Sequence, residues 1–490
     1  MSAETAESDL LGHEAPDTPA PLRDVFDRLR RASREGGPSS CHERRGHLER
    51  LGGVIRARTA DITEAIRADF GHRSKHETLL AEVHLTLAHL RFVRRNLGRW
   101  MRPRRCAVSL PFLPARARIH HQPLGVVGII SPWNYPFQLS MLPFIEALAA
   151  GNRVLLKPSE IAPRTAEVLR QIVETTFEPF LAAVVTGGPE VGAAFCRLPL
   201  DHLFFTGSTA VGRSVLAAAA RNLTPVTLEL GGKCPAILGE GSPLAGFARR
   251  VVAGKLFNAG QTCLAPDYVL APADRIDPLV RCLEEAIARF YPALARNPDY
   301  TSIIDERHYQ RLKGWIEDAR RKGAAVVEVN PAAEEDLAAQ RKIAPTLILG
   351  ARDDMLVMQE EIFGPLLPIR PYDRLESALE YLASRPRPLA LYYFGRDRRR
   401  IRQVLERTCS GGVCIHDTIV HAAQHALPLG GVGESGMGAY HGRKGFETFS
   451  HARSVFYQSR LSLSHLVRPP YGRFADRLLS RLVGRSDRGP

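Results

Sequence analysis

A cysteine that follows a glycine-containing turn is the first residue that could do chemistry. Residues 257–263 read FNAGQTC, which places Cys263 just past the turn, where its thiol could be presented as a nucleophile. Taken alone this pattern is weak, because an isolated cysteine is more often a small buried hydrophobic side chain. Whether Cys263 is a nucleophile or a packed side chain depends on the other segments that carry potential catalytic or binding residues.

A carboxylate at the end of an apolar stretch is the second candidate. Residues 227–233 read TLELGGK, and Glu229 lies within the apolar part of this segment. Burial penalises the charged form of a carboxylate and raises its pKa towards the range that suits a general base. The alternative interpretation is that Glu229 caps a neighbouring helix.

A fixed amide donor is the third candidate. Residues 131–137 read SPWNYPF, and the two prolines restrict the backbone around Asn134. An amide donates hydrogen bonds without titrating, which suits an oxyanion hole. An asparagine between prolines is otherwise an ordinary turn residue.

Two further segments favour nucleotide binding. Residues 204–212 read FFTGSTAVG, and Gly207 and Gly212 would let a ligand approach the backbone at a helix N-terminus, where free N–H groups favour phosphate. The spacing departs from G-x-G-x-x-G, so this motif is weak by itself. Residues 157–160 read KPSE at the end of another expected strand, and they add a cation and a carboxylate that could hold a ribose.

The elements that must position these residues alternate between short β-rich runs and helical runs. Such alternation is typical of a mostly parallel sheet with helices on both faces. Before it, from about residue 25 to residue 99, the pattern is mostly helical. We expect strands at 125–130, 153–156, 182–185, 202–205 and 226–230, with helices at 140–150, 165–177, 190–197 and 209–222.

A second α/β series runs from Lys255 to about Cys414, with expected strands at 268–271, 325–329 and 364–369. Residues 427–440 are dense in glycine, which predicts a close-packed loop rather than a regular element.

Composition places few other constraints on function. No stretch reaches the ~18 uninterrupted apolar residues that a membrane span needs. The first twenty residues carry five acids and no Lys or Arg, so they predict a disordered tail rather than a secretory signal. Eight cysteines without paired spacing predict neither a disulfide framework nor a zinc site. We therefore expect a cytoplasmic protein without a bound metal.

The formal charge of +14 raises the question of nucleic-acid binding. Seven arginines and no acid lie within residues 91–105, and seven arginines against two aspartates lie within residues 460–488. Neither stretch has the interleaved aromatic residues of a base-stacking platform, so we expect no nucleic-acid partner. A solvated basic surface is the simplest interpretation, and weak contact with an anionic lipid surface is the alternative. Residues 475–483 have helical apolar spacing with arginines opposite.

Together, the segments at 131–137, 204–212, 227–233 and 257–263 resemble the aldehyde dehydrogenase superfamily, over roughly residues 51–450. Further matches are EEIFGP at 360–365 and the glycine-rich segment 428–440. Within the family, the chain is most similar to the class 3 and coniferyl aldehyde dehydrogenase branch.

The resemblance implies a thioester mechanism. Cys263 would attack the aldehyde carbon, and Asn134 with the backbone N–H of Cys263 would hold the oxyanion. Hydride transfer to the nicotinamide would leave a thioester, which water activated by Glu229 would hydrolyse. Lys157 and Glu160 would contact the adenosine ribose, Ser208 the pyrophosphate, and Glu361 with Phe363 the nicotinamide ribose. The expected cofactor-binding residues are Trp133, Lys157, Ser159, Glu160, Gly207, Ser208, Gly212, Leu230, Gly231, Glu361 and Phe363.

The resemblance also implies the architecture: an aldehyde dehydrogenase fold with an open-sheet, Rossmann-like cofactor domain, an α/β catalytic domain and a β oligomerisation arm, assembled as a homodimer. We expect a tail at 1–23, the NAD(P)-binding domain at 24–230 with a bridging strand near 116–122, the catalytic domain at 231–418, the bridging segment at 419–458 and a basic amphipathic tail at 459–490.

Substrate and cofactor choice are less constrained. The branch suggests an aromatic, coniferyl-type aldehyde, and a medium- or long-chain aliphatic aldehyde is the alternative. Glu160 should repel a 2′-phosphate and so favours NAD, although class 3 members with the same KPSE segment accept NADP as well. Two rival functions remain. One is a non-catalytic binding protein on the same fold, and the presence of Cys263, Glu229 and Asn134 argues against it. The other is a coenzyme-A-acylating dehydrogenase, and Glu229 argues against it because this residue would activate water.

Four other residues have two interpretations each. Cys234 is expected to be a packed thiol rather than a second catalytic group. His416, His421 and His425 could shape substrate choice, but loop or surface histidines are the commoner case, and no carboxylate or cysteine spacing accompanies them to form a metal site.

Overall fold

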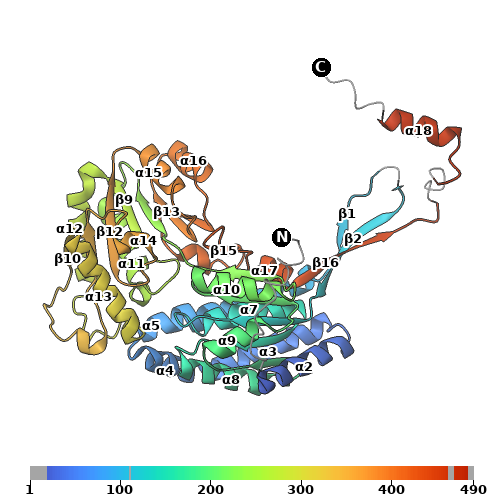
Figure 1. Cartoon of the computed structure of the whole chain (residues 1–490), viewed down its shortest axis with the longest axis horizontal. Helices are drawn as coiled ribbons and strands as arrows, with labels where there is room; N and C mark the ends of the chain where they lie inside the picture. The colour runs from blue at the N-terminus through green and yellow to red at the C-terminus, as the bar shows by residue number, and fades with distance from the viewer. Residues whose placement is uncertain (1–18, 110–111, 462–467, 484–490) are drawn as a thin grey trace, which may run out of the picture.

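The computed structural model describes residues 19–109, 112–461 and 468–483. Figure 1 shows two α/β parts lying side by side, one coloured blue to green and the other mainly yellow to orange, with a narrow β arm projecting from the first. No helix among the described residues is long and apolar enough to cross a membrane.

The first part is built on a six-stranded sheet with the order β15-β7-β6-β3-β4-β5. Neighbouring strands are parallel except β15, which pairs antiparallel with β7. The central strands are continuous apolar runs, as expected where helices cover both faces of a parallel sheet. The strands are β3 (Val126–Ile130), β4 (Arg153–Lys157), β5 (Ala182–Val184), β6 (His202–Thr206), β7 (Val226–Glu229) and β15 (Gly436–Met437).

Helices surround this sheet, and α7 is the most deeply buried of them. Every residue of α7 after Gln138 is buried, which accords with a helix that is apolar all round. The α-helices of this part are α2 (Ala20–Glu35), α3 (Cys41–Ala57), α4 (Thr59–Phe70), α5 (Lys75–Glu77), α6 (Leu85–Trp100), α7 (Gln138–Ala150), α8 (Pro163–Thr176), α9 (Pro189–Cys196), α10 (Thr209–Ala220) and α17 (Gly442–Thr448), and a π-helical turn, η1 (Thr78–His84), joins α5 to α6.

The second part is built on a seven-stranded sheet with the order β10-β11-β12-β9-β8-β13-β14, in which only the pair β10–β11 is antiparallel. Its strands are β8 (Pro235–Leu238), β9 (Tyr268–Pro272), β10 (Ala325–Glu328), β11 (Thr346–Leu349), β12 (Leu366–Tyr372), β13 (Ala390–Phe394) and β14 (Gly412–Ile415). Its helices are α11 (Leu244–Leu256), α12 (Ile276–Phe290), α13 (Glu306–Arg321), α14 (Leu356–Gln359), α15 (Leu375–Ala383) and α16 (Arg398–Arg407).

The arm is a three-stranded antiparallel sheet of β1 (Arg104–Cys106), β2 (Arg116–Pro123) and β16 (Ser450–Tyr457). All eight residues of β16 pair with β2, from Ser450 opposite Pro123 to Tyr457 opposite Arg116. Beyond the arm lies α18 (Arg473–Val483), which Figure 1 shows away from the two sheets.

The α/β fold, the five strands expected between residues 125 and 230 and the helix near residues 475–483 are confirmed. Two local predictions were wrong. The expected tail of residues 1–23 ends earlier, because α2 begins at Ala20 and Leu22 is buried; residues 1–18 lie outside the described chain. The glycine-rich segment is also not wholly irregular, because β15 within it adds an antiparallel edge strand to β7.

Candidate active site

Parallel pairing brings the predicted residues to one edge of the first sheet. Ile130, at the end of β3, lies opposite Lys157 on one side and Phe205 on the other, and Thr206 lies opposite Glu229. The carboxyl ends of the strands therefore meet at this edge, where an open α/β sheet binds its ligands. A cleft of about 570 Å³ opens there; its walls include Trp133, Asn134, Gly207, Ser208, Glu229, Leu230, Gly231, Cys263, Glu361 and Phe363.

Cys263 follows a backbone bend made of three left-handed residues. Asn258, Ala259 and Gly260 have φ values of 54°, 51° and 78°. The left-handed conformation costs a residue with a side chain about 1 kcal/mol, so other contacts must hold the bend. At Gly260 no side chain would fit, because an added Cβ would lie 2.3 Å from the carbonyl oxygen of Gly364.

Buried hydrogen bonds hold this bend. The backbone N–H of Asn258 donates to Oε2 of Glu77 over 3.0 Å. The side-chain Nδ2 of Asn258 donates to the carbonyl oxygens of Asn134, at 3.0 Å, and Gln261, at 3.1 Å. The segment that carries Cys263 and the segment that carries Asn134 are therefore joined directly.

The thiol of Cys263 is embedded among acids. Burial, aided by the neighbouring carboxylates of Glu361 and Glu229, raises its pKa to about 12, although the nearby backbone N–H groups of Cys263 and Leu264 oppose the shift. The thiol therefore needs a proton acceptor or an approaching cation to become a nucleophile.

Glu229 is 5% exposed at the end of β7. Burial raises the pKa of its carboxyl group well above the usual value, and the charge of Glu146 adds to the shift. Its Oε1 has no hydrogen-bond partner among the described residues, so the carboxyl group is not serving as a helix cap through that oxygen. A carboxylate in this state suits a general base better than a structural ligand.

Asn134 lines the cleft and is 3% exposed. The side-chain Nδ2 of Asn134 donates to the backbone carbonyl oxygen of Gln261 over 3.1 Å. The backbone carbonyl oxygen of Asn134 accepts from Asn258 and from Arg73. Both the side chain and the peptide group are thus fixed beside Cys263, as an oxyanion donor requires.

The predicted phosphate-binding residues lie at the start of α10. Ser208 caps this helix, with its hydroxyl accepting from the N–H of Val211 at 3.4 Å, and Gly207 lines the cleft beside it. Gly212 does not line the cleft. It packs behind Leu230, where an added Cβ would lie 2.7 Å from that side chain, so its contribution is to let α10 approach β7.

The predicted ribose-binding residues lie one strand farther along the sheet. Lys157 ends β4 and its Nζ forms an ion pair with Oε2 of Glu160 at 2.9 Å. Burial alone would raise the pKa of Glu160, but the hydrogen bonds from Lys157 and from its own backbone N–H, together with the charge of Lys157, outweigh burial and lower the pKa. Lys157 and Ser159 are buried; Lys157, Ser159 and Glu160 are all outside the lining of the main cleft.

Glu361 enters the cleft from the second part. Burial raises the pKa of its carboxyl group to about 8, helped by the charge of Asp267, and its Oε1 lacks a partner within the described chain. Gly231 makes room for it, since an added Cβ there would lie 2.0 Å from Oε2. Phe363 packs beside it on Trp133, with ring centroids 5.3 Å apart.

Several residues around the site were not predicted from the sequence. Lys233 forms an ion pair with Asp267 and donates to the carbonyl oxygen of Glu360 at 2.8 Å, which anchors the loop that carries Glu361. His308 packs on Trp133 with centroids 4.9 Å apart. The network of Arg73, Glu77 and Glu82 was also missed, because its ion pair joins residues nine positions apart, a spacing that marks no face of a helix.

Cys234 is fully buried, as predicted, and its thiol donates to the carbonyl oxygen of Cys263 over 3.3 Å. His421 lies in a short 3-10 helix, Val420–Ala423, and His425 in the loop after it; both are half-buried rather than exposed, and burial lowers the pKa of both. Across the described residues there is no cluster of histidine, cysteine and acidic side chains that could hold a metal ion.

Residues 6–455 match the aldehyde dehydrogenase family. The chain is 48% identical over 464 residues to a coniferyl aldehyde dehydrogenase of a Pseudomonas species, covering 94% of this chain and 96% of that one. Its structure is similar to the substrate-bound state of a Staphylococcus aureus aldehyde dehydrogenase named AldH, with a TM-score of 0.89, 36% identity and coverage of 94% and 99%. It is also similar to the NAD+ complex of a Bacillus cereus aldehyde dehydrogenase, with a TM-score of 0.80, 25% identity and coverage of 90% and 89%.

The fold and the cleft define an α/β oxidoreductase with a nucleotide-binding sheet edge beside a half-buried thiol. The chain belongs to the aldehyde dehydrogenase family, whose members oxidise aldehydes with NAD(P)+.

The bend before Cys263 yields a test in which neighbouring substitutions have different effects. Asn258→Ala removes two buried hydrogen bonds and a side chain that tolerates positive φ, so we expect a loss of about 2–4 kcal/mol in the free energy of unfolding. Ala259→Gly should be nearly neutral, because relief of about 1 kcal/mol of strain offsets the loss of one buried methyl group, about 0.8 kcal/mol. Urea unfolding followed by fluorescence measures both, and equal losses would contradict the proposed support of the bend.

Proposed function

We propose that this enzyme oxidises an aromatic, coniferyl-type aldehyde to its carboxylic acid with NAD(P)+, through a thioester on Cys263. The observation that carries the proposal is the meeting of Cys263, Glu229 and Asn134 in one cleft. The choice of an aromatic aldehyde is supported by the 48% identity to the Pseudomonas coniferyl aldehyde dehydrogenase.

The chain's own groups account for most of the reaction. The thiolate of Cys263 attacks the carbonyl carbon, and the developing oxyanion accepts hydrogen bonds from Nδ2 of Asn134 and the backbone N–H of Cys263. A nicotinamide cofactor held beside Cys263 by Glu361 and Phe363 would supply the hydride acceptor, so that loss of hydride from the adduct would leave a thioester on Cys263. Glu229 then removes a proton from a water molecule as its oxygen attacks the thioester, which releases the acid and restores the thiol.

The residues around the cleft fit the cofactor. Glu361 presents a buried oxygen without a partner among the described residues, as a group that binds a ribose hydroxyl would. Gly207 and Ser208 place the open N-terminus of α10 where a pyrophosphate could lie. Lys157 and Glu160 would hold the adenosine ribose, and the exposed carboxylate of Glu160 disfavours a 2′-phosphate, so we propose that NAD is preferred. Because the mechanism needs a free thiol, we place the activity in a reducing compartment such as the cytoplasm.

The first test is NADH formation by the purified protein. Coniferyl aldehyde, benzaldehyde derivatives and aliphatic aldehydes of increasing chain length are compared with NAD and with NADP. We expect the highest kcat/KM for an aromatic aldehyde with NAD, and no activity in Cys263→Ala. A better aliphatic substrate would refute the substrate proposal, and full activity in Cys263→Ala would refute the thioester.

Glu229→Gln separates the two halves of the reaction. Because only the carboxylate form of Glu229 can accept a proton and its pKa is raised, kcat of the unmodified enzyme should rise with pH as Glu229 loses its proton, at a pH well above the usual range for a carboxyl group. The variant should lose about 10²–10⁴-fold in kcat and lose this pH dependence, while still releasing one NADH per site in the first turnover. Stopped-flow absorbance follows both phases, and a lost first turnover would assign Glu229 to an earlier step.

We also propose a homodimer formed through the arm and weak contact of the C-terminal tail with anionic membranes. Phe456 and Tyr457, at the end of β16, are half exposed, as residues of an interface would be in a single chain. On α18, Arg473, Arg477 and Arg481 recur every four residues, and Phe474, Leu479 and Val483 are exposed apolar residues. A basic helix with an apolar side is typical of a surface that binds anionic lipid.

A chain ending at Ser459 tests the tail separately from the arm. We expect this variant to remain dimeric by light scattering and to keep its activity, but to lose flotation with vesicles that contain anionic phospholipid. Vesicles of neutral lipid serve as the control. Unchanged flotation with anionic vesicles would refute the membrane contact, and a monomeric full-length protein would refute the dimer.

A further inference from the structure

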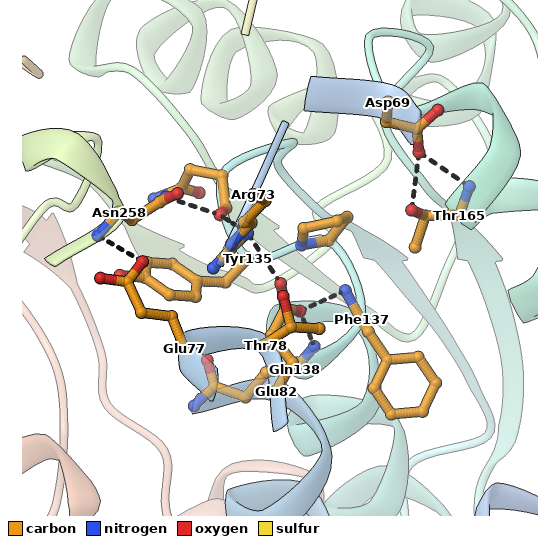
Figure 2. A network of polar contacts seen from close by, with 12 residues as sticks. Asp69, Arg73, Glu77, Thr78, Glu82, Tyr135, Phe137, Gln138, Thr165 and Asn258 are labelled. Atoms are coloured by element: carbon orange, nitrogen blue, oxygen red, sulfur yellow. Dashed lines mark hydrogen bonds and ion pairs between the residues drawn. The ribbon is translucent and has the colours of Figure 1, made fainter. Parts of the chain in front are cut away.

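Arg73 is a buried arginine beside the candidate oxyanion hole, in the short connection between α4 and α5. Its side chain is fully buried, and its guanidinium lies over the rings of Phe70, at 4.9 Å, and Tyr135, at 4.8 Å. Figure 2 shows it between the segment of Asn258 and the start of α7. A buried arginine is costly unless its charge is matched, so its partners indicate why it is there.

The partners of Arg73 hold the loop of Asn134 at both ends. Nη1 of Arg73 donates to the carbonyl oxygen of Asn134 over 2.8 Å and forms an ion pair with Oε1 of Glu82 at 2.9 Å. Oε2 of Glu82 accepts from the N–H groups of Phe137, at 2.9 Å, and Gln138, at 3.0 Å. The Arg73–Glu82 ion pair therefore binds the backbone carbonyl of residue 134 through Arg73 and the backbone N–H groups of residues 137 and 138 through Glu82.

The same carbonyl oxygen connects Arg73 to the nucleophile. The carbonyl oxygen of Asn134 also accepts from Nδ2 of Asn258, in the bend that leads to Cys263. Glu77, four residues after Arg73, accepts from the backbone N–H of Asn258 and from the hydroxyl of Thr301 at 3.2 Å. The segment from Arg73 to Glu82 thus contacts both loops that carry the proposed oxyanion donors: the loop of Asn134 and the bend that leads to Cys263.

We propose that Arg73, fixed by Glu82, is a positioning residue that sets the orientation of Asn134 towards the oxyanion formed on the substrate of Cys263. This inference rests on the proposed function of Asn134. An oxyanion donor must be held to a fraction of an ångström, and a misplacement of about 1 Å can cost about 10²-fold in rate. Nη1 makes both contacts, while Nε and Nη2 have no hydrogen-bond partner among the described residues, so a single nitrogen joins the backbone carbonyl of Asn134 to the carboxylate of Glu82.

The test compares two reactions of the same thiol. p-Nitrophenyl acetate acylates Cys263 through a tetrahedral oxyanion, whereas iodoacetamide alkylates it by direct displacement and forms no oxyanion. In Arg73→Met we expect acylation to slow by about 10–100-fold, while alkylation changes by less than about 3-fold. Arg73→Lys and Glu82→Gln keep part of the buried network and should fall between this variant and the unmodified enzyme.

Asp69→Asn is the matched control for loss of stability. Asp69 lies at the end of α4 close to Arg73, but its carboxylate accepts from the N–H of Thr165, at 2.9 Å, and the N–H of Arg164, at 3.0 Å, and so anchors α8 (Figure 2). We expect this variant to melt at a lower temperature with an unchanged ratio of acylation to alkylation. Equal slowing of both reactions in the Arg73 and Glu82 variants, or no slowing of acylation, would overturn the proposal.

A double-mutant cycle with Asn134→Ala separates this inference from the function on which it rests. If Arg73 acts through Asn134, adding Arg73→Met to Asn134→Ala should slow acylation by less than about 3-fold further. Full additivity would overturn the proposal. A normal acylation rate in Asn134→Ala would instead refute the oxyanion role of Asn134. A slow acylation rate in Asn134→Ala together with a normal acylation rate in Arg73→Met would refute only the positioning role of Arg73.

Discussion

The left-handed bend at Asn258, Ala259 and Gly260 turns the chain so that Cys263 faces the cleft between the two sheets. Such a bend is unfavourable for two of its three residues, and it persists because buried groups accept hydrogen bonds from the backbone N–H and from Nδ2 of Asn258. One of those groups, the carboxylate of Glu77, comes from the N-terminal helices, 181 residues earlier in the chain, and another, the backbone carbonyl of Asn134, lies in the loop after β3. The reactive thiol therefore depends on the packing of the cofactor domain as much as on its own domain.

Buried carboxyl groups are the second constraint on the cleft. Glu229 and Glu361 each have an oxygen without a partner in the described part of the chain, and burial raises the pKa of both. Such groups destabilise a fold, since an unsatisfied buried polar atom costs about 1–3 kcal/mol. The same unpaired oxygens are free to bind water, substrate or cofactor, which is why unsatisfied polar groups are common at active sites.

The chain passes from the first sheet to the second immediately after Glu229. Strand β7 ends at Glu229, and β8 of the second sheet begins at Pro235, so only residues 230–234 lie between them. Gly231 and Gly232 lie in this connection, and Gly231 leaves the space that Glu361 occupies. Glu229, at the end of a strand of the first sheet, and Glu361, from a loop of the second part, thus come to line one cleft.

The residue pattern by itself determined the fold class, most strands of the cofactor sheet and the identities of Cys263, Glu229 and Asn134 as candidates, because alternation and the short FNAGQTC and TLELGGK segments are local properties of the chain. It misplaced the start of α2 and missed β15, since a two-residue edge strand depends on the partner β7 rather than on its own sequence.

Tertiary structure alone decided which residues support the site. Gly212, predicted at the cofactor, lies outside the cleft lining and packs behind Leu230. Arg73, Glu77 and Glu82 were not singled out, although they contact the loops of Asn134 and Asn258. The reason is that a buried ion pair or a hydrogen bond across 60 to 180 residues leaves no periodic trace in sequence. Only folding shows which charges are removed from water and which partners they meet.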